Sequence, residues 1–249
     1  MKQRYFLDIA YQGTKYHGWQ IQKNAITIQE IIEDCLTKLL GEVTPIVGSG
    51  RTDAGVHALQ QIAHFDALLT ITPGELKHRM NGFLPNDIAI NTIDPVTEDG
   101  HARYTAYSRS YQYCIHQQKN PFLQDRSLFY WQSLDIAIMN KAANYLIGTQ
   151  DFKCFSKANT DVKHYICQIT EAQWKKHNHQ LIFYISANRF LRGMVRAIVG
   201  TLLMIGKNEV PIEELDEIIA SKNRSRAGKS ASACGLYLSE VKYPTEIYQ

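Results

Sequence analysis

The segment 48–57 combines a carboxylic acid, a basic side chain and three glycines within ten residues, Gly-Ser-Gly-Arg-Thr-Asp-Ala-Gly-Val-His. Glycines at this density are typical of a tight loop with an accessible backbone. Arg51 stands two residues before Asp53, and a neighbouring guanidinium keeps a carboxylate ionised and fixed in direction. Asp53 is therefore a candidate nucleophile or general base. The plainer alternative is a turn aspartate that bonds its own backbone.

A glycine-rich loop can also hold the phosphates of a nucleotide, but this one lacks the required spacing. It contains neither G-x-G-x-x-G nor Gly-Lys-Ser/Thr, and the residues after it alternate like a strand, not a helix. His57 and His64 follow without a Cys or carboxylate at metal-ligand spacing. We therefore expect neither a nucleotide-binding loop nor a metal site.

A second set of candidate residues is basic and aromatic. Arg189, Arg192 and Arg196 recur at helical spacing, and a helix over 190–205 would place them on one face. That face could meet RNA phosphate or an active-site acid, or it could be a solvated surface. Tyrosines and arginines also alternate over 103–113. Such rings can stack on unpaired bases, although we expect most of these tyrosines to pack on a helix.

The hydrophobic pattern predicts a scaffold in which one order of elements occurs twice. The first half is expected to contain strands over 5–11, 46–47, 57–65 and 88–93 and helices over 27–40 and 72–82. The second half is expected to contain strands over 108–116, 165–174, 180–186 and 236–241 and helices over 135–146, 190–205 and 211–220. Two such β-α-β-β-α-β units predict an α+β fold. Its two ferredoxin-like halves would share a mainly antiparallel sheet, with helices packed on one face. A segment rich in Pro, Gly and acidic residues at 94–103 divides the halves into 1–103 and 104–249.

Length and composition exclude several classes of protein. The 249 residues are 45% hydrophobic, enough for one large or two small domains without disulfide or metal staples. Five cysteines without a close C-x-x-C pair favour a reduced, cytoplasmic protein. No apolar run approaches the ~18 residues of a transmembrane helix. The N-terminus reads into a strand and not into a signal peptide.

Charge is unevenly distributed along the chain. The net charge is +3, and residues 125–249 carry 16 Lys and Arg against 12 Asp and Glu. A basic stripe in this half would suit a polyanionic partner. A solvated basic surface is the alternative.

The segment Gly50–His57 resembles the signature of the tRNA pseudouridine synthase A family. Four further stretches resemble motifs of that family at matching separations, namely 11–20, 101–113, 190–200 and 235–238. The resemblance extends over residues 5–243, nearly the whole chain. The sequence departs from the pattern at 157–166, which is short and poor in arginine for a stretch that contacts tRNA.

The resemblance implies isomerisation of uridine to pseudouridine at positions 38, 39 and 40 in the anticodon stem-loop of tRNA, without a metal or a small-molecule cofactor. It implies that Asp53 acts as nucleophile, at C6 or at C1′, or as a base, and that Arg196 is its ion-pair partner. The target base must leave its stack, and Tyr111 is then the stacking platform while Leu236 lines the other side of the pocket. Arg51 is expected to hold the backbone of the flipped nucleotide or to fill the space that the base leaves, and further RNA contacts are expected from Arg189 and Arg192.

The resemblance also implies a homodimer across which one tRNA lies. A different class of function stays open, namely a non-catalytic RNA-binding protein that grips a flipped uridine. A glycosidase-like hydrolase is less favoured, because no second acid accompanies Asp53 in the motifs.

Overall fold

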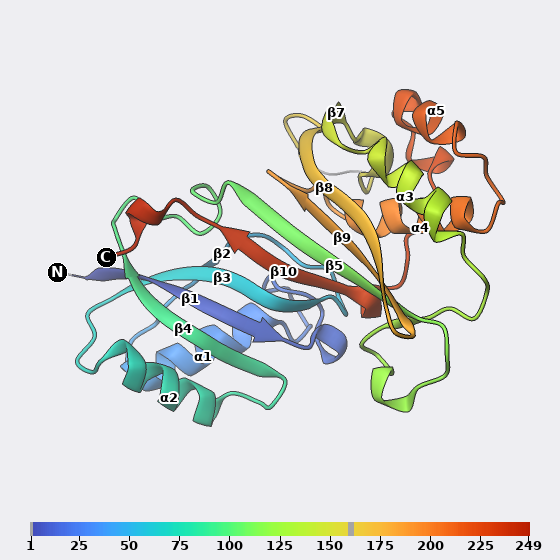
Figure 1. The fold of residues 1–249 in the computed structure, drawn as a ribbon. Coiled ribbons are helices and arrows are strands. Elements are labelled where there is room, and N and C mark those ends of the chain that lie inside the picture. The colour runs from blue at the N-terminus through green and yellow to red at the C-terminus, as the bar shows by residue number, and fades with distance from the viewer. Residues whose placement is uncertain (1, 159–161) are drawn as a thin grey trace. The chain divides into compact units, whose positions relative to one another are not determined.

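The computed structural model describes residues 2–158 and 162–249 (Figure 1). Over these ranges the chain is α+β, with ten strands and five α-helices. The strands pair mainly antiparallel, so the predicted fold class is confirmed. Two compact units can be separated, residues 1–108 with 237–249 and residues 109–236. In the described part of the chain, no helix has the length and apolar character needed to span a membrane.

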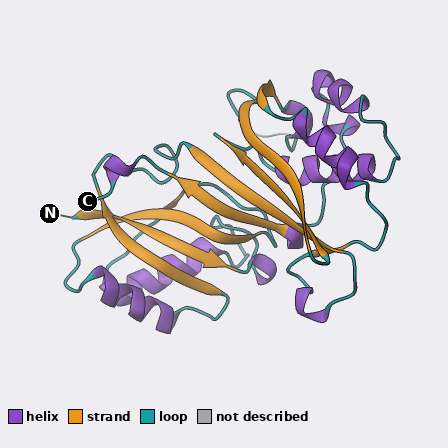
Figure 2. Cartoon of the chain, in the orientation of Figure 1, coloured by secondary structure: helices purple, strands orange, loops and turns teal. Residues whose placement is uncertain are grey.

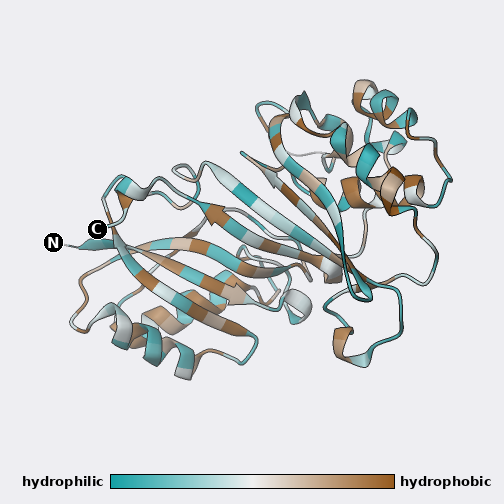
Figure 3. Ribbon diagram, viewed as in Figure 1, coloured by the Kyte–Doolittle hydropathy of each residue, from teal (hydrophilic) through white to brown (hydrophobic). Residues whose placement is uncertain are grey.

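The first unit is a sheet with its α-helices along one side (Figure 2). Its strands lie in the order β4 (Ile88–Val96), β1 (Gln3–Tyr11), β3 (His57–Ala67) and β10 (Leu236–Lys242), and β2 (Val47–Gly48) pairs with β3. The helices are α1 (Ile28–Leu40) and α2 (Pro73–Phe83). Hydrophobic and hydrophilic residues alternate along the strands (Figure 3), as expected where one face packs against helices.

Local sequence explains where α1 begins and ends. The Thr27 side chain accepts a hydrogen bond from the Glu30 amide, and Gly41 takes the left-handed conformation that terminates the helix. Thr72 caps α2 in the same way, with Pro73 at the first helical position. The predicted ranges of these two helices, 27–40 and 72–82, are therefore confirmed to within one residue.

The second unit pairs its strands in the order β5 (Ser108–His116), β9 (Gln180–Ala187), β8 (Ile166–His177) and β7 (Gly148–Asp151), with β6 (Leu128–Phe129) parallel to β5. Its helices are α3 (Ile136–Asn144), α4 (Met194–Gly206) and α5 (Glu214–Ser221). The sequence did not predict the short strands β6 and β7, which have two and four residues.

The helix expected over 190–205 begins four residues later. Gly193 has a φ of 71° and precedes Met194, the first helical residue. A left-handed residue cannot continue a right-handed helix backwards, so Arg189 and Arg192 lie before α4. The prediction that they share a helical face with Arg196 is wrong.

The C-terminal strand belongs with the first unit. The sequence placed it in a half comprising 104–249, whereas residues 237–249 pack with residues 1–108. β10 pairs in parallel with β3, and the rings of Tyr243 and Tyr248 lie 4.9 Å and 6.1 Å from that of Phe6. Aromatic packing therefore anchors the end of the chain on β1.

Candidate active site

Asp53 lies on the loop between β2 and β3 in the first unit. Its side chain is half-buried, while Arg51 is exposed. The Val56 amide donates to the Asp53 carbonyl at 3.1 Å, closing a turn whose third residue, Gly55, has a φ of 76°. A turn of this shape requires glycine at that position, which accounts for the Asp-Ala-Gly order of the motif.

A second loop, residues 12–19, holds this turn through main-chain hydrogen bonds. The Trp19 amide donates to the Thr52 carbonyl at 3.2 Å, and the Gly55 amide donates to the Tyr16 carbonyl at 3.3 Å. The two contacts lie on either side of the candidate aspartate. Its backbone is therefore fixed from both directions.

Side-chain hydrogen bonds and close backbone packing also join the 12–19 segment to the Asp53 loop. The hydroxyls of Tyr11 and Thr52 share a hydrogen bond of 2.8 Å, and the Gly13 amide donates to Nδ1 of His57 at 3.1 Å. A Cβ built on Gly13 would lie 1.9 Å from the Val56 carbonyl oxygen. Only glycine permits the two loops to approach this closely.

His57 is part of this support. It is 1% exposed, and its ring stacks on Tyr237 with 4.6 Å between centroids and 21° between planes. Nδ1 accepts a hydrogen bond, so a neutral ring carries its proton on Nε2. Among the residues that the structure describes, no cluster of three or more His, Cys, Asp or Glu could hold a metal ion.

The start of the loop is fixed from β3. The Ser49 amide donates to the Ile62 carbonyl at 2.7 Å, and the Ser49 hydroxyl donates to Oε1 of Gln61 at 2.7 Å. Nε2 of Gln61 donates to the Gly50 carbonyl at 2.9 Å. The glycine-rich loop is thus held along its length.

Arg196 lies on α4 in the second unit and is half-buried. Its Nε donates to the Ala231 carbonyl at 2.7 Å, and the Ala231 amide donates to the Arg196 carbonyl at 2.9 Å. This reciprocal pair fixes the side chain at its Nε.

The segment 227–231, which holds Arg196, is seated on α4 by close contacts. The Gly228 amide donates to the buried Thr201 hydroxyl at 2.9 Å, and that hydroxyl donates to the Ala197 carbonyl at 2.9 Å. A Cβ built on Gly200 would lie 1.8 Å from a carbonyl oxygen of this segment. The position of Arg196 therefore depends on packing one turn further along the helix.

Tyr111 and Tyr113 lie on β5 and have different environments. Tyr111 is half-buried and meets the Phe190 ring edge-on, with centroids 5.1 Å apart. Tyr113 is buried, its hydroxyl donates to the Ser232 carbonyl at 2.8 Å, and burial raises its pKa. Tyr113 is thus a core residue, while Tyr111 keeps an accessible ring surface.

Leu236 follows Gly235, where a Cβ would lie 2.8 Å from Cζ of Tyr113. The glycine lets this segment lie against the tyrosine ring, and Leu236 itself is buried. Tyr104 and Tyr107 are exposed, contrary to the expectation that most of the tyrosines in 103–113 pack on a helix.

Arg189 and Arg192 flank the turn before α4. Arg189 lies 3.1 Å from Nε2 of His164 and is half-buried, whereas the Arg192 side chain is exposed. The Arg192 carbonyl accepts a hydrogen bond of 2.9 Å from the Lys157 amide. This turn presents a basic surface, although not the helical one that the sequence predicted.

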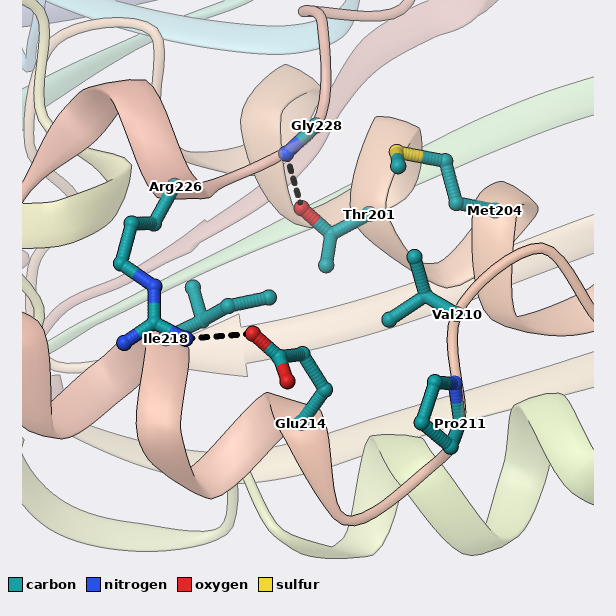
Figure 4. Close-up of a pocket in the computed structure, with 8 residues that line it drawn as sticks. All are labelled: Thr201, Met204, Val210, Pro211, Glu214, Ile218, Arg226 and Gly228. Carbon is teal, nitrogen blue, oxygen red and sulfur yellow. Dashed lines mark hydrogen bonds and ion pairs between the residues drawn. The ribbon is translucent and has the colours of Figure 1, made fainter.

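A cavity of about 240 Å³ opens between α4 and α5 (Figure 4). Met204, Val210 and Ile218 give it an apolar lining, and Arg226 pairs with Glu214 at its edge. None of the residues predicted for the active site lines it. Of its polar lining groups, the Glu214 carboxylate pairs with Arg226 and the Thr201 hydroxyl accepts from the Gly228 amide.

The structure thus places Asp53 and Arg51 on one braced loop of the first unit, and the remaining predicted site residues in the second. Sequence reasoning missed the supporting role of the 12–19 loop. Its glycine spacing was the available signal, since Gly13 and Gly18 both lie where backbones meet.

Comparison with known proteins identifies the family to which the chain is similar. Residues 9–105 and 142–244 match the family model described as tRNA pseudouridine synthase. The chain is 46% identical over 250 residues to the tRNA pseudouridine synthase A of Porphyromonas gingivalis, covering 98% of this chain and 99% of that protein. It is 44% identical over 249 residues to the protein of that name from Bacteroides fragilis, covering 99% of each.

These matches include the Asp53 loop, the 12–19 loop and α4, the parts of the chain whose geometry is described above. The chain therefore belongs to the tRNA pseudouridine synthase family.

Proposed function

We propose that this tRNA pseudouridine synthase acts at positions 38, 39 and 40 of the anticodon stem-loop and uses Asp53 to begin the reaction. The observation that carries the assignment to Asp53 is its position in a turn held on both sides by the 12–19 loop. A reacting group must be held close to its productive geometry. A half-buried carboxylate on a braced backbone meets that requirement.

The isomerisation defines what the carboxylate must do. The N1–C1′ bond breaks, the uracil turns, and a C5–C1′ bond forms while the C5 hydrogen leaves as a proton and N1 gains one. Asp53 can attack at C6 or C1′, or remove a proton as a base, and each route needs it ionised. No electrons are gained or lost overall.

Three residues of the second unit complete the proposal through their motif positions. Arg196 supplies the positive charge that supports the carboxylate, and its fixed Nε limits the directions in which its guanidinium can point. Tyr111 offers a ring on which a flipped base can stack. Leu236 supplies apolar surface beside it.

The RNA contacts and the assembly are further parts of the proposal. Arg51, Arg189 and Arg192 contact the tRNA backbone, and the protein works in the cytoplasm as a homodimer that binds one tRNA. Light scattering tests the assembly, since a dimer has about twice the 28.5 kDa mass of one chain. A mass of one chain at assay concentration would contradict it.

Tritium release tests the reaction. Unmodified tRNA carrying tritium at uridine C5 is incubated with the wild-type protein and with Asp53→Ala, and filter binding is measured in parallel. We expect release by the wild type alone, with tRNA bound by both. Binding without release by either protein would favour the RNA-binding alternative.

Stem-loops test the positions. Each contains a single uridine, at position 38, 39, 40 or elsewhere in the hairpin. Product at the first three alone supports the proposed specificity. Equal product from the uridine placed elsewhere would contradict it.

A further inference from the structure

Tyr16 connects the Asp53 turn to the start of β4. Its hydroxyl donates to Oδ1 of Asp87 at 2.5 Å, and its carbonyl accepts from the Gly55 amide at 3.3 Å. Tyr16 is only 7% exposed. One residue therefore bonds an aspartate through its side chain and the catalytic turn through its main chain.

Asp87 is itself firmly placed. It directly precedes β4, where the Ile88 amide donates to the Pro85 carbonyl at 2.9 Å. The Asp87 carbonyl accepts from the Gln12 amide at 2.9 Å. Oδ2 of Asp87 lies 3.4 Å from Nζ of Lys15. Asp87 thus contacts the 12–19 loop through both backbone and side chain, and it anchors this loop to the sheet.

The charge states suit this arrangement. Burial, with the bond to Asp87 as a second cause, raises the pKa of the Tyr16 hydroxyl, so it remains a donor throughout the neutral range. The Asp87 side chain is 14% exposed, and a carboxylate shielded from water requires its partners. The Tyr16 hydroxyl, at 2.5 Å, lies closer to this carboxylate than Nζ of Lys15, at 3.4 Å.

We propose that Tyr16 and Asp87 are positioning residues for Asp53, and that their hydrogen bond sets the place of the Asp53 turn by holding the Tyr16 carbonyl. The inference rests on the proposed role of Asp53. Neither residue touches the reacting atoms in this account. Their loss should therefore lower kcat and leave KM for tRNA unchanged.

Tyr16→Phe is the central variant, because it removes the hydroxyl and keeps the ring. We expect kcat for tritium release to fall about 10-fold to 100-fold, since displacements near 1 Å carry effects of this size. Asp87→Asn retains an oxygen that can accept from the Tyr16 hydroxyl, so it should keep kcat within about threefold. Asp87→Ala should match Tyr16→Phe, and the double variant Tyr16→Phe/Asp87→Ala should be no slower than either, because both remove one interaction.

Tyr243→Phe is the matched control. Tyr243 is also 7% exposed, lies in the same unit, and donates a hydrogen bond of 2.5 Å to the Ala102 carbonyl. Its loss should lower the midpoint of urea unfolding about as much as Tyr16→Phe, with kcat unchanged. A purely structural role for Tyr16 would make the two variants alike in both measurements.

Three outcomes would overturn the inference. They are an unchanged kcat in Tyr16→Phe, an effect on KM alone, and a loss of kcat in Asp87→Asn as large as that in Asp87→Ala. Failure of the proposed function is recognised separately, because the wild-type protein would then release no tritium, or Asp53→Ala would release as much as the wild type.

Discussion

Gly18 approaches Thr52 so closely that a Cβ built on Gly18 would lie 2.4 Å from the Thr52 carbonyl oxygen. Gly18 also has a φ of 90°, which favours glycine. The adjacent Trp19 amide donates to the same carbonyl at 3.2 Å. Thr52, the residue just before Asp53, is therefore positioned by a backbone contact that only glycine at position 18 permits.

Gly18→Ala should consequently impair catalysis beyond its cost in stability. The added methyl must displace Thr52, and with it Asp53, so we expect kcat for tritium release to fall at least about 10-fold. Gly41→Ala is the control, because Gly41 has a φ of 75° with no atom within 4 Å of an added Cβ. Both substitutions strain the backbone by about 1 kcal/mol, but only the first should lower kcat. Equal kcat values for the two variants would contradict the account.

Thr201→Val should destabilise the second unit. The substitution removes the hydroxyl that accepts from the Gly228 amide at 2.9 Å. Because Gly228 is buried, its unsatisfied amide should lower the free energy of unfolding by about 1–3 kcal/mol. Urea unfolding measures this, and Thr201→Ser, which keeps the hydroxyl, should retain most of the stability. The valine variant should also lose kcat, because segment 227–231 bonds Arg196. Unaltered stability in the valine variant would show that the hydrogen bond is unimportant.

Stability should fall between neutral and mildly acid pH because of His64. This residue is 6% exposed, and burial, together with the charges of Arg4 and His101, lowers its pKa to about 4 against the opposing effect of Asp66. The Ala102 amide donates to its Nδ1 at 3.1 Å, which also requires the neutral ring.

The sign of the pH effect follows from linkage. The unfolded chain binds the proton near pH ~6.5 and the folded chain only near pH 4. The contribution of neutral His64 is therefore complete above that range and is lost as pH falls through it, by about 3 kcal/mol at most. His64→Asn keeps an acceptor and should reduce the change of the unfolding midpoint with pH between pH ~6.5 and pH 4. His179→Asn, at an exposed residue, should leave this pH dependence unchanged. A slope that persists in His64→Asn would refute the assignment.

Arg192 should contribute to tRNA binding through charge. Its side chain is exposed on the turn before α4, where it can reach phosphate. Arg192→Ala should weaken tRNA binding and reduce the slope of log affinity against log salt by about 1. Arg79→Ala removes an exposed arginine that pairs with Glu75 on α2 and should leave that slope unchanged. The same slope in both variants would exclude a phosphate contact at Arg192.

Much of the fold could be predicted because its signals are local. Thr27 and Thr72 cap α1 and α2 and so indicate where these helices begin. The alternation over Ser108–His116 gives the bounds of β5. The start of α4 after Gly193 could not be predicted from local sequence. The surroundings of this glycine read as continuous helix, and only the observed φ of 71° reveals that α4 starts after it.

The missed part of the site depends on distant residues. Tyr16 and Asp87 are 71 positions apart, so no local pattern connects them. The return of β10 to β3 likewise follows from the pairing of strands and not from hydrophobic periodicity. The family could be predicted from the motif around Asp53, while the contacts that hold the Asp53 turn required the structure.

A single-turnover assay tests the central claim most directly. Enzyme in excess is mixed with C5-tritiated tRNA, and the wild type is compared with Asp53→Asn, whose intact mass is checked for reversion by deamidation. The asparagine keeps the shape of the turn but cannot act as an anionic nucleophile or base. We predict that the wild type releases tritium in one exponential phase and that Asp53→Asn, while binding tRNA with unchanged affinity, releases none. Release by Asp53→Asn at a rate near that of the wild type would contradict the account.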